Sequence, residues 1–280
     1  MTVPPSSLSP AGVASRDVVI LPETNLSARL YLPQSQVSST RKLPTIIYFH
    51  GGGFIMESPF SSTYHPYTDA LSAKSNALIV SVNYSRAPEN PLPAAYEDGW
   101  SALKWVVQRW DPWLRDHANL DRIYLVGDSL GANLGHHMAM KAGIESLGVR
   151  VHGLVLVHPY FWASDVSEEE AKSSDMAEKL WKFSCPMTVG LDDPWINPMA
   201  DGVGALKKLG CERVLVCLAE KDCLRQRGRV YYEALKKCRW EGVAEIVETE
   251  GEDHCFHLFD PESGRAKDFI DQLVSFITRC

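Results

Sequence analysis

Ser129 stands in the segment GDSLG, residues 127–131, directly after the apolar run RIYLV and directly before a helical pattern. A G-x-S-x-G sequence between a strand and a helix is typical of a nucleophilic serine, because the glycines allow a tight turn that exposes the hydroxyl. A capping serine in a glycine-rich turn is the alternative reading. The strand–turn–helix context favours a nucleophile that attacks a carbonyl carbon.

A serine hydroxyl reacts only when a base removes its proton and a third group holds that base. In folds that carry this motif, the partners follow in the chain order serine, acid, histidine. Asp222 follows the apolar run RVLVCLA, and His254 lies in the loop after VAEIVET, so these are the predicted acid and base. His257 is the remaining rival for the base, whereas Asp253 and Asp260 do not follow a strand end.

A second glycine cluster, HGGG at residues 50–53, follows the apolar run LPTIIYF. Backbone N–H groups in such a loop could hold a phosphate or the oxyanion of an acyl-transfer reaction. No G-K-[ST] follows the run and no G-x-G-x-x-G opens a helix here, which argues against phosphate. We therefore predict an oxyanion hole made by the amides of Gly51, Gly52 and Leu130, the residue after the serine.

The elements that position these residues are strands that alternate with helices, which predicts a mostly parallel sheet covered on both faces. At 280 residues we expect a single domain, 1–280. An insertion around residues 161–198 interrupts the alternation and is expected to form a lid or binding element. Strands are expected at residues 16–21, 28–33, 44–50, 77–84, 122–128, 151–159, 213–222 and 243–251, and helices at 94–110, 131–143, 226–238 and 265–280.

The composition excludes several classes of function. The net charge of −7 and the scattered lysines and arginines argue against nucleic acid as a partner. No apolar stretch is long enough to cross a membrane, and the N-terminus has no leader pattern. The seven cysteines form no C-x-x-C pair, which indicates a reducing, cytoplasmic compartment without a zinc site. We expect no metal, no cofactor, and a monomer or weak homodimer.

The motifs that carry a resemblance to a known family are HGGGF (50–54), VNYSRAPENPLPAAYEDGW (82–100), GDSLGANL (127–134), HGLVLVHPYF (152–161), DDPWINP (192–198) and EDHCFHLF (252–259). In these motifs the chain closely resembles the plant carboxylesterases of the hormone-sensitive-lipase group of α/β-hydrolases. The resemblance implies the α/β-hydrolase fold, with an eight-stranded sheet, Ser129 as nucleophile, Asp222 as acid and His254 as base.

Two departures from the family pattern concern the pocket. Leu130 stands where the family usually has a small residue, so we expect an altered acyl-pocket floor. The relatives carry an N-terminal cap segment ahead of VPPS that is apparently missing here, so we expect a partial cap and an open site. An open site buries less acyl chain, which predicts a preference for short esters.

The resemblance implies a serine carboxylesterase that hydrolyses small neutral esters through an acyl-enzyme. Phe54 and Phe161 are expected to bind substrate as pocket walls. A lyase, dehydratase or cyclase that acts on a plant metabolite is the alternative, since a base and an oxyanion hole also serve proton abstraction beside a carbonyl. A hormone receptor of the same group is less consistent with the sequence, because a receptor does not need His254.

Overall fold

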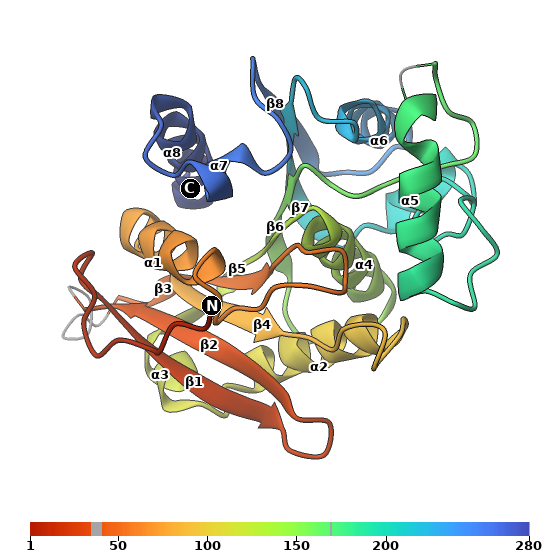
Figure 1. Ribbon diagram of the computed structural model, residues 1–280. Coiled ribbons are helices and arrows are strands. Elements are labelled where there is room, and N and C mark those ends of the chain that lie inside the picture. Colours follow the sequence, from red (N-terminus) through yellow and green to blue (C-terminus); the bar gives the residue numbers. More distant parts are fainter. Residues whose placement is uncertain (35–40, 169, 280) are drawn as a thin grey trace.

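The computed structural model describes residues 1–34, 41–168 and 170–279, and it contains one eight-stranded sheet in the order β1-β2-β4-β3-β5-β6-β7-β8 (Figure 1). β1 pairs with β2 and β2 with β4 in antiparallel fashion, and the remaining pairs are parallel. The predicted mostly parallel sheet is therefore confirmed. The strands are β1 (Val13–Leu21), β2 (Leu26–Pro33), β3 (Leu43–Phe49), β4 (Leu78–Asn83), β5 (Ala118–Asp128), β6 (Val151–Val157), β7 (Cys211–Ala219) and β8 (Val243–Thr249).

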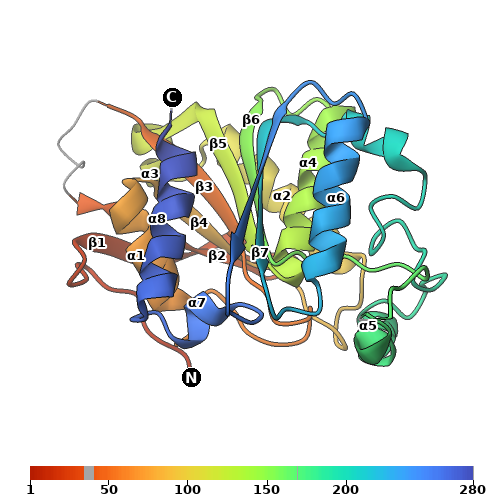
Figure 2. The ribbon, with the colours of Figure 1, turned by 90° about the horizontal axis from the view of Figure 1, so that it is seen from above.

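Helices cover both faces of the sheet (Figure 2). α1 (Tyr64–Ser75) and α8 (Gly264–Thr278) pack side by side on one face, and α2 (Ala94–Gln108), α4 (Leu130–Ile144) and α6 (Arg225–Lys237) cover the other. The shorter helices are α3 (Pro112–His117), α7 (Phe256–Phe259) and the 3₁₀ helix η2 (Val203–Lys208). No helix among the described residues is long and apolar enough to cross a membrane.

The central strands are buried on both faces, which explains their unbroken apolar sequences. Ile46 and Ile47 on β3 point to opposite faces, and both are fully buried, as are Leu125 and Val126 on β5. Because every side chain of such a strand enters one of two core layers, its sequence shows no alternation of apolar and polar residues. Each predicted strand is therefore found at its apolar run in the sequence.

Two of the longer helices were not expected from the sequence, and neither were the short α3, α7 and η2. α1 buries several polar side chains. The Thr68 hydroxyl donates a hydrogen bond to the Tyr64 carbonyl, and the Ser72 hydroxyl donates one to the Ala77 carbonyl. Such hydrogen-bonded hydroxyls replace part of the apolar stripe that normally identifies a helix.

The end of the predicted C-terminal helix, Cys280, lies outside the described residues.

The second of these longer helices, α5 (Ala171–Ser184), lies in the insertion at residues 161–198. In Figure 2 it lies at the same end of the sheet as α7, where the parallel strands end. The segment is attached to α6 by the buried Arg227, whose guanidinium donates to Glu170 at 2.6 Å and to Asp165 at 2.9 Å. The pair with Glu170 is buried on both sides and is therefore costly to break, so it holds the insertion beside the strand ends.

Candidate active site

The turn between β5 and α4 presents Ser129 at the carboxyl end of the sheet. Ser129 has φ 54° and ψ −122°, a conformation that non-glycine residues rarely adopt. Its amide donates to the Val157 carbonyl at 2.8 Å, and its own carbonyl accepts the Tyr160 amide at 3.0 Å. These bonds to the end of β6 and the chain beyond it hold the strained turn in place.

Ser129, His254 and Asp222 form a continuous hydrogen-bonded chain. The distance from Ser129 Oγ to His254 Nε2 is 3.0 Å, and from His254 Nδ1 to Asp222 Oδ2 it is 2.8 Å. Because an ionised carboxylate can only accept, Nδ1 carries the imidazole proton and Nε2 is left free to accept the serine proton. The second Asp222 oxygen accepts the Leu224 amide at 2.9 Å, which fixes the orientation of the buried carboxylate.

The two candidate histidines have opposite environments. Burial alone would lower the pKa of His254, but the hydrogen bond and charge of Asp222, with the charges of Asp128 and Asp253, outweigh it and raise this pKa above its ordinary value. His257 packs between aromatic rings, neither of its ring nitrogens has a partner among the described residues, and burial lowers its pKa to about 3. The geometry therefore places His254, and not His257, beside the serine.

The glycine loop after β3 requires a correction of one predicted donor. The Gly51 amide donates to the Tyr64 hydroxyl at 2.8 Å, so it is already committed inside the protein. The amides of Gly52 and Gly53 make no hydrogen bond to other described residues, and both glycines line the cavity in front of the serine. Gly52 has φ +102°, a value that L side chains rarely adopt, so this position requires glycine.

Leu130 is the first residue of α4, so its amide has no acceptor within the helix. This leaves the amide available at the turn as a donor. The Leu130 side chain, however, is 1% exposed and belongs to the hydrophobic core. It does not line the cavity, so the expected change to the pocket floor is not found.

A cavity of about 510 Å³ opens beside Ser129 and His254. Its volume suits a small molecule, and its walls are mainly apolar. The insertion contributes Leu180 from α5, and α7 with the residues beside it contributes Cys255, Leu258 and Phe259. The apolar and aromatic lining residues are Ile55, Met56, Tyr64, Tyr160, Leu180, Leu224, Leu258 and Phe259.

The prediction that Phe54 and Phe161 bind substrate is wrong. Phe54 is 1% exposed and packs edge-to-face against Tyr84 and Tyr96, and Phe161 is fully buried against Tyr231. The positive φ of Phe54, 58°, directs its ring into the core beneath the loop. Leu180 and Tyr64 were not predicted as pocket residues, because neither of the helices that carry them was expected from the sequence.

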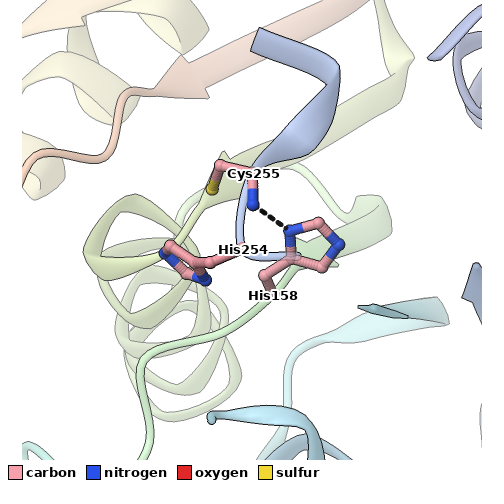
Figure 3. Close-up of side chains that lie close together, drawn as sticks. All are labelled: His158, His254 and Cys255. Atoms are coloured by element: carbon pink, nitrogen blue, oxygen red, sulfur yellow. Dashed lines mark hydrogen bonds between the residues drawn. The ribbon is translucent and has the colours of Figure 1, made fainter. Parts of the chain in front are cut away.

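His158, His254 and Cys255 lie close together, with ligand-type atoms within 4.8 Å of one another (Figure 3). His158 Nδ1 accepts the Cys255 amide at 2.9 Å, and both nitrogens of His254 are used by Asp222 and Ser129. A cation bound by His254 would have to replace its hydrogen bond to Asp222 or to Ser129. The group instead holds the histidine loop against the end of β6.

Comparisons with known proteins identify the family of the chain. The family described as alpha/beta hydrolase fold matches residues 46–258. Probable carboxylesterase 2 of Arabidopsis thaliana is 45% identical over 279 residues, which cover 98% of this chain and 88% of the relative. The 2-hydroxyisoflavanone dehydratase of Glycyrrhiza echinata is 44% identical over 293 residues, which cover 98% of this chain and 88% of that protein.

Solved structures show the same architecture. A thermostable carboxylesterase cloned from a metagenomic library has a TM-score of 0.80 and 27% identity, and the match covers 94% of this chain and 88% of that one. An esterase from the archaeon Pyrobaculum calidifontis has a TM-score of 0.78 and 28% identity, and the match covers 94% and 85% of the two chains. The chain therefore belongs to the α/β-hydrolase fold family, in the group of the plant carboxylesterases.

Proposed function

We propose that the protein is a serine carboxylesterase that hydrolyses small neutral carboxylic esters. The observation that carries the proposal is the hydrogen-bonded chain from Ser129 through His254 to Asp222, which opens into an apolar cavity. Relatives named as carboxylesterases support the same activity. The mainly apolar walls favour uncharged acyl and alcohol groups.

The reaction follows from the positions of these groups. Ser129 Oγ attacks the ester carbonyl carbon while its proton moves to His254 Nε2, and the carbonyl oxygen becomes an oxyanion. Collapse of this intermediate breaks the bond to the alcohol, which leaves with the proton from Nε2 and gives an acyl-enzyme. Water then attacks the acyl carbon with His254 as base, and the acid is released from the regenerated serine.

The oxyanion donors that we propose are the amides of Gly52, Gly53 and Leu130, in place of the set that included Gly51. The first two line the cavity, and the third lies directly after the nucleophile at the start of α4. Removing one donor of an oxyanion hole typically costs about 10²–10³ in kcat. Asp222 keeps the proton of His254 on Nδ1 and stabilises the imidazolium that forms.

Replacing the nucleophile tests the proposal. Ser129→Ala should lower kcat/KM for p-nitrophenyl acetate by at least about 10⁴-fold, because it removes the nucleophile of the proposed mechanism. The melting temperature should stay unchanged. A fluorophosphonate probe should label the wild-type protein at Ser129, as peptide mapping would show. Substantial hydrolysis by a folded Ser129→Ala variant would exclude the mechanism.

A dehydratase is the second candidate, because the 2-hydroxyisoflavanone dehydratase noted above is about as similar as the carboxylesterases. The same base and oxyanion donors could remove a proton beside a ketone and stabilise the enolate. Incubation with 2-hydroxyisoflavanone and with p-nitrophenyl acetate in parallel separates the two. Turnover of the first and not the second would favour the dehydratase.

For the cell, we propose a cytoplasmic protein that acts on a small molecule, without nucleic acid or membrane as a partner. Its support is the state of the thiols: six cysteines among the described residues are free. One relative is named as mitochondrial, so the compartment needs a direct test. Microscopy of the fluorescently tagged full-length chain, with a mitochondrial marker alongside, provides it.

A further inference from the structure

The Gly51 amide is joined to the nucleophile turn through one tyrosine. Gly51 N–H donates to Tyr64 Oη at 2.8 Å, and Tyr64 Oη donates its proton to Asp128 Oδ2 at 2.6 Å. Gly51 directly precedes the proposed donor Gly52, and Asp128 directly precedes Ser129. The two hydrogen bonds therefore connect the oxyanion loop to the nucleophile turn through groups that the catalytic steps do not use.

Asp128 receives hydrogen bonds from three separate segments. Besides Tyr64 on α1, its carboxylate accepts the Tyr48 hydroxyl of β3 at 2.7 Å and the Cys255 thiol at 3.7 Å. The aspartate, the two tyrosines and the cysteine are each at most 4% exposed. A buried carboxylate with well-formed bonds is costly to displace, so the atoms that it holds have little freedom to move.

The first glycine of the HGGG run has a steric reason to be glycine. A Cβ at Gly51 would lie 2.5 Å from the Asp128 carboxylate and 2.9 Å from the Tyr64 hydroxyl, closer than real contacts allow. The backbone must approach this closely for its amide to reach Tyr64. Gly51 therefore allows the hydrogen bond that fixes the loop to Tyr64, whereas the next two glycines line the cavity.

We propose that Tyr64, held by Asp128, is a positioning residue that fixes the oxyanion loop. Three consecutive glycines leave a chain with many conformations, whereas oxyanion donors contribute most when they are already oriented. The bond from Tyr64 restrains the peptide that leads into Gly52 and Gly53, so that their amides stay directed at the oxygen beside Ser129. This inference rests on the proposed esterase function.

The test is a split between kcat and KM in Tyr64→Phe. The variant keeps the ring and removes only the hydroxyl, so kcat for p-nitrophenyl acetate should fall by about 10–100-fold while KM changes by less than about 3-fold. A trifluoromethyl ketone, whose carbonyl oxygen becomes an oxyanion when Ser129 adds to it, should bind more weakly by a similar factor. Unchanged kcat and unchanged ketone affinity would overturn the proposal.

Tyr124→Phe is the matched control for lost stability. Tyr124 is also fully buried, and its hydroxyl donates to the Ile277 carbonyl at 2.8 Å, away from the cavity. We expect a similar fall in melting temperature in both variants and a loss of kcat only in Tyr64→Phe. Equal loss of kcat in both would mean that the effect is general destabilisation, and the positioning role would be rejected.

Asp128→Asn provides a second variant, which remains informative if Tyr64→Phe folds poorly. It should lower kcat without raising KM, because the amide cannot accept both hydroxyl bonds. In the variant that combines Tyr64→Phe with Asp128→Asn, kcat should fall by no more than about 3-fold beyond the larger of the two single losses, because both substitutions break the same connection between the two loops. If the two losses of kcat multiply instead, the residues act independently and the proposed connection is contradicted.

Ser129→Ala, measured alongside, separates failure of this inference from failure of the proposed function. An inactive Ser129→Ala with a fully active Tyr64→Phe rejects only the positioning role. Full activity in Ser129→Ala rejects the serine esterase mechanism itself.

Discussion

His254 should set the acid side of the pH–activity profile. Only neutral imidazole can accept the serine proton, and the bond and charge of Asp222 raise the pKa of His254 above its ordinary value despite burial. We therefore expect kcat/KM to fall with decreasing pH through a midpoint above about 6.5, the ordinary histidine value. Initial rates of p-nitrophenyl acetate hydrolysis from pH 5 to 9 measure this midpoint.

His257 supplies the matched control for this prediction. His254→Gln should abolish nearly all hydrolysis, whereas His257→Leu should keep both the rate and the acid midpoint, because His257 is buried among aromatic rings. A midpoint below about 6.5 in the wild type would contradict the raised pKa. Loss of activity in His257→Leu alone would transfer the base to that residue.

At the scale of residues, the sequence predicted what depends on chain order and could not predict what depends on side-chain direction. Ser129, Asp222 and His254 each follow a strand, and the parallel sheet brings their strand ends together. Phe54 and Phe161 also lie next to such ends, but their rings enter the core. A local backbone angle decides the direction of Phe54, and no neighbouring residue type reveals that angle.

At the scale of elements, α5 forms the side of the cavity above the glycine loop. Leu180 lines the cavity, and its Cδ1 lies 3.2 Å from where a Cβ of Gly53 would be. Leu180→Ala should raise KM for p-nitrophenyl butyrate by about 5–10-fold, or about 1–1.4 kcal/mol. This is below the roughly 1.5–3 kcal/mol of a fully buried apolar side chain, because Leu180 is only partly buried. The acetate ester, which reaches less of the wall, should be affected less.

Phe183 on the same helix is the control for this substitution, because it is 50% exposed and does not line the cavity. Phe183→Ala should leave KM for both esters unchanged. Steady-state kinetics on the two esters provides the comparison. Equal effects of the two substitutions would mean that α5 acts through its overall stability and not as a wall of the cavity.

Whether a helix or strand could be predicted from the sequence depended on how its side chains are buried. β3 and β5 are covered on both faces, so their unbroken apolar sequences identified them. α1 buries hydroxyls that bond to its own or the following backbone, so its apolar stripe is weak. α5 does carry a helical signal, since Ala177, Trp181 and Ser184 are buried at a spacing of one and two turns. The surrounding polar and acidic residues obscured that signal.

At the scale of the whole molecule, buried histidines should make the protein sensitive to acid. Burial lowers the pKa of His50 and His257 to about 3, and it lowers those of His136 and His158 well below the ordinary value. Below about pH 6.5 the unfolded chain binds protons that the folded protein does not bind. The free energy of unfolding should therefore fall with decreasing pH, by up to about 1.4 kcal/mol per pH unit for each such histidine.

Urea unfolding between pH 4.5 and 7.5 measures this slope. His257→Leu should reduce this slope by the contribution of one histidine, roughly 1.4 kcal/mol per pH unit, because neither ring nitrogen of His257 has a hydrogen-bond partner to lose among the described residues. The free energy of unfolding of His257→Leu, relative to that of the wild type, should therefore rise as the pH falls. A slope identical to that of the wild type would show that His257 is protonated in the folded state.

The order of the strands along the chain also governs when activity can arise during biosynthesis. Ser129 and His254 are separated by 125 positions, and Asp222 and His254 by 32. At about 5–20 residues per second, roughly 6–25 s pass between synthesis of the nucleophile and of its base. A nascent chain that has emerged through β6 holds the serine and the glycine loop without a base. It cannot act on cellular esters until β7 and β8 complete the sheet, and a chain stopped before β8 is an inactive protein rather than a weak enzyme.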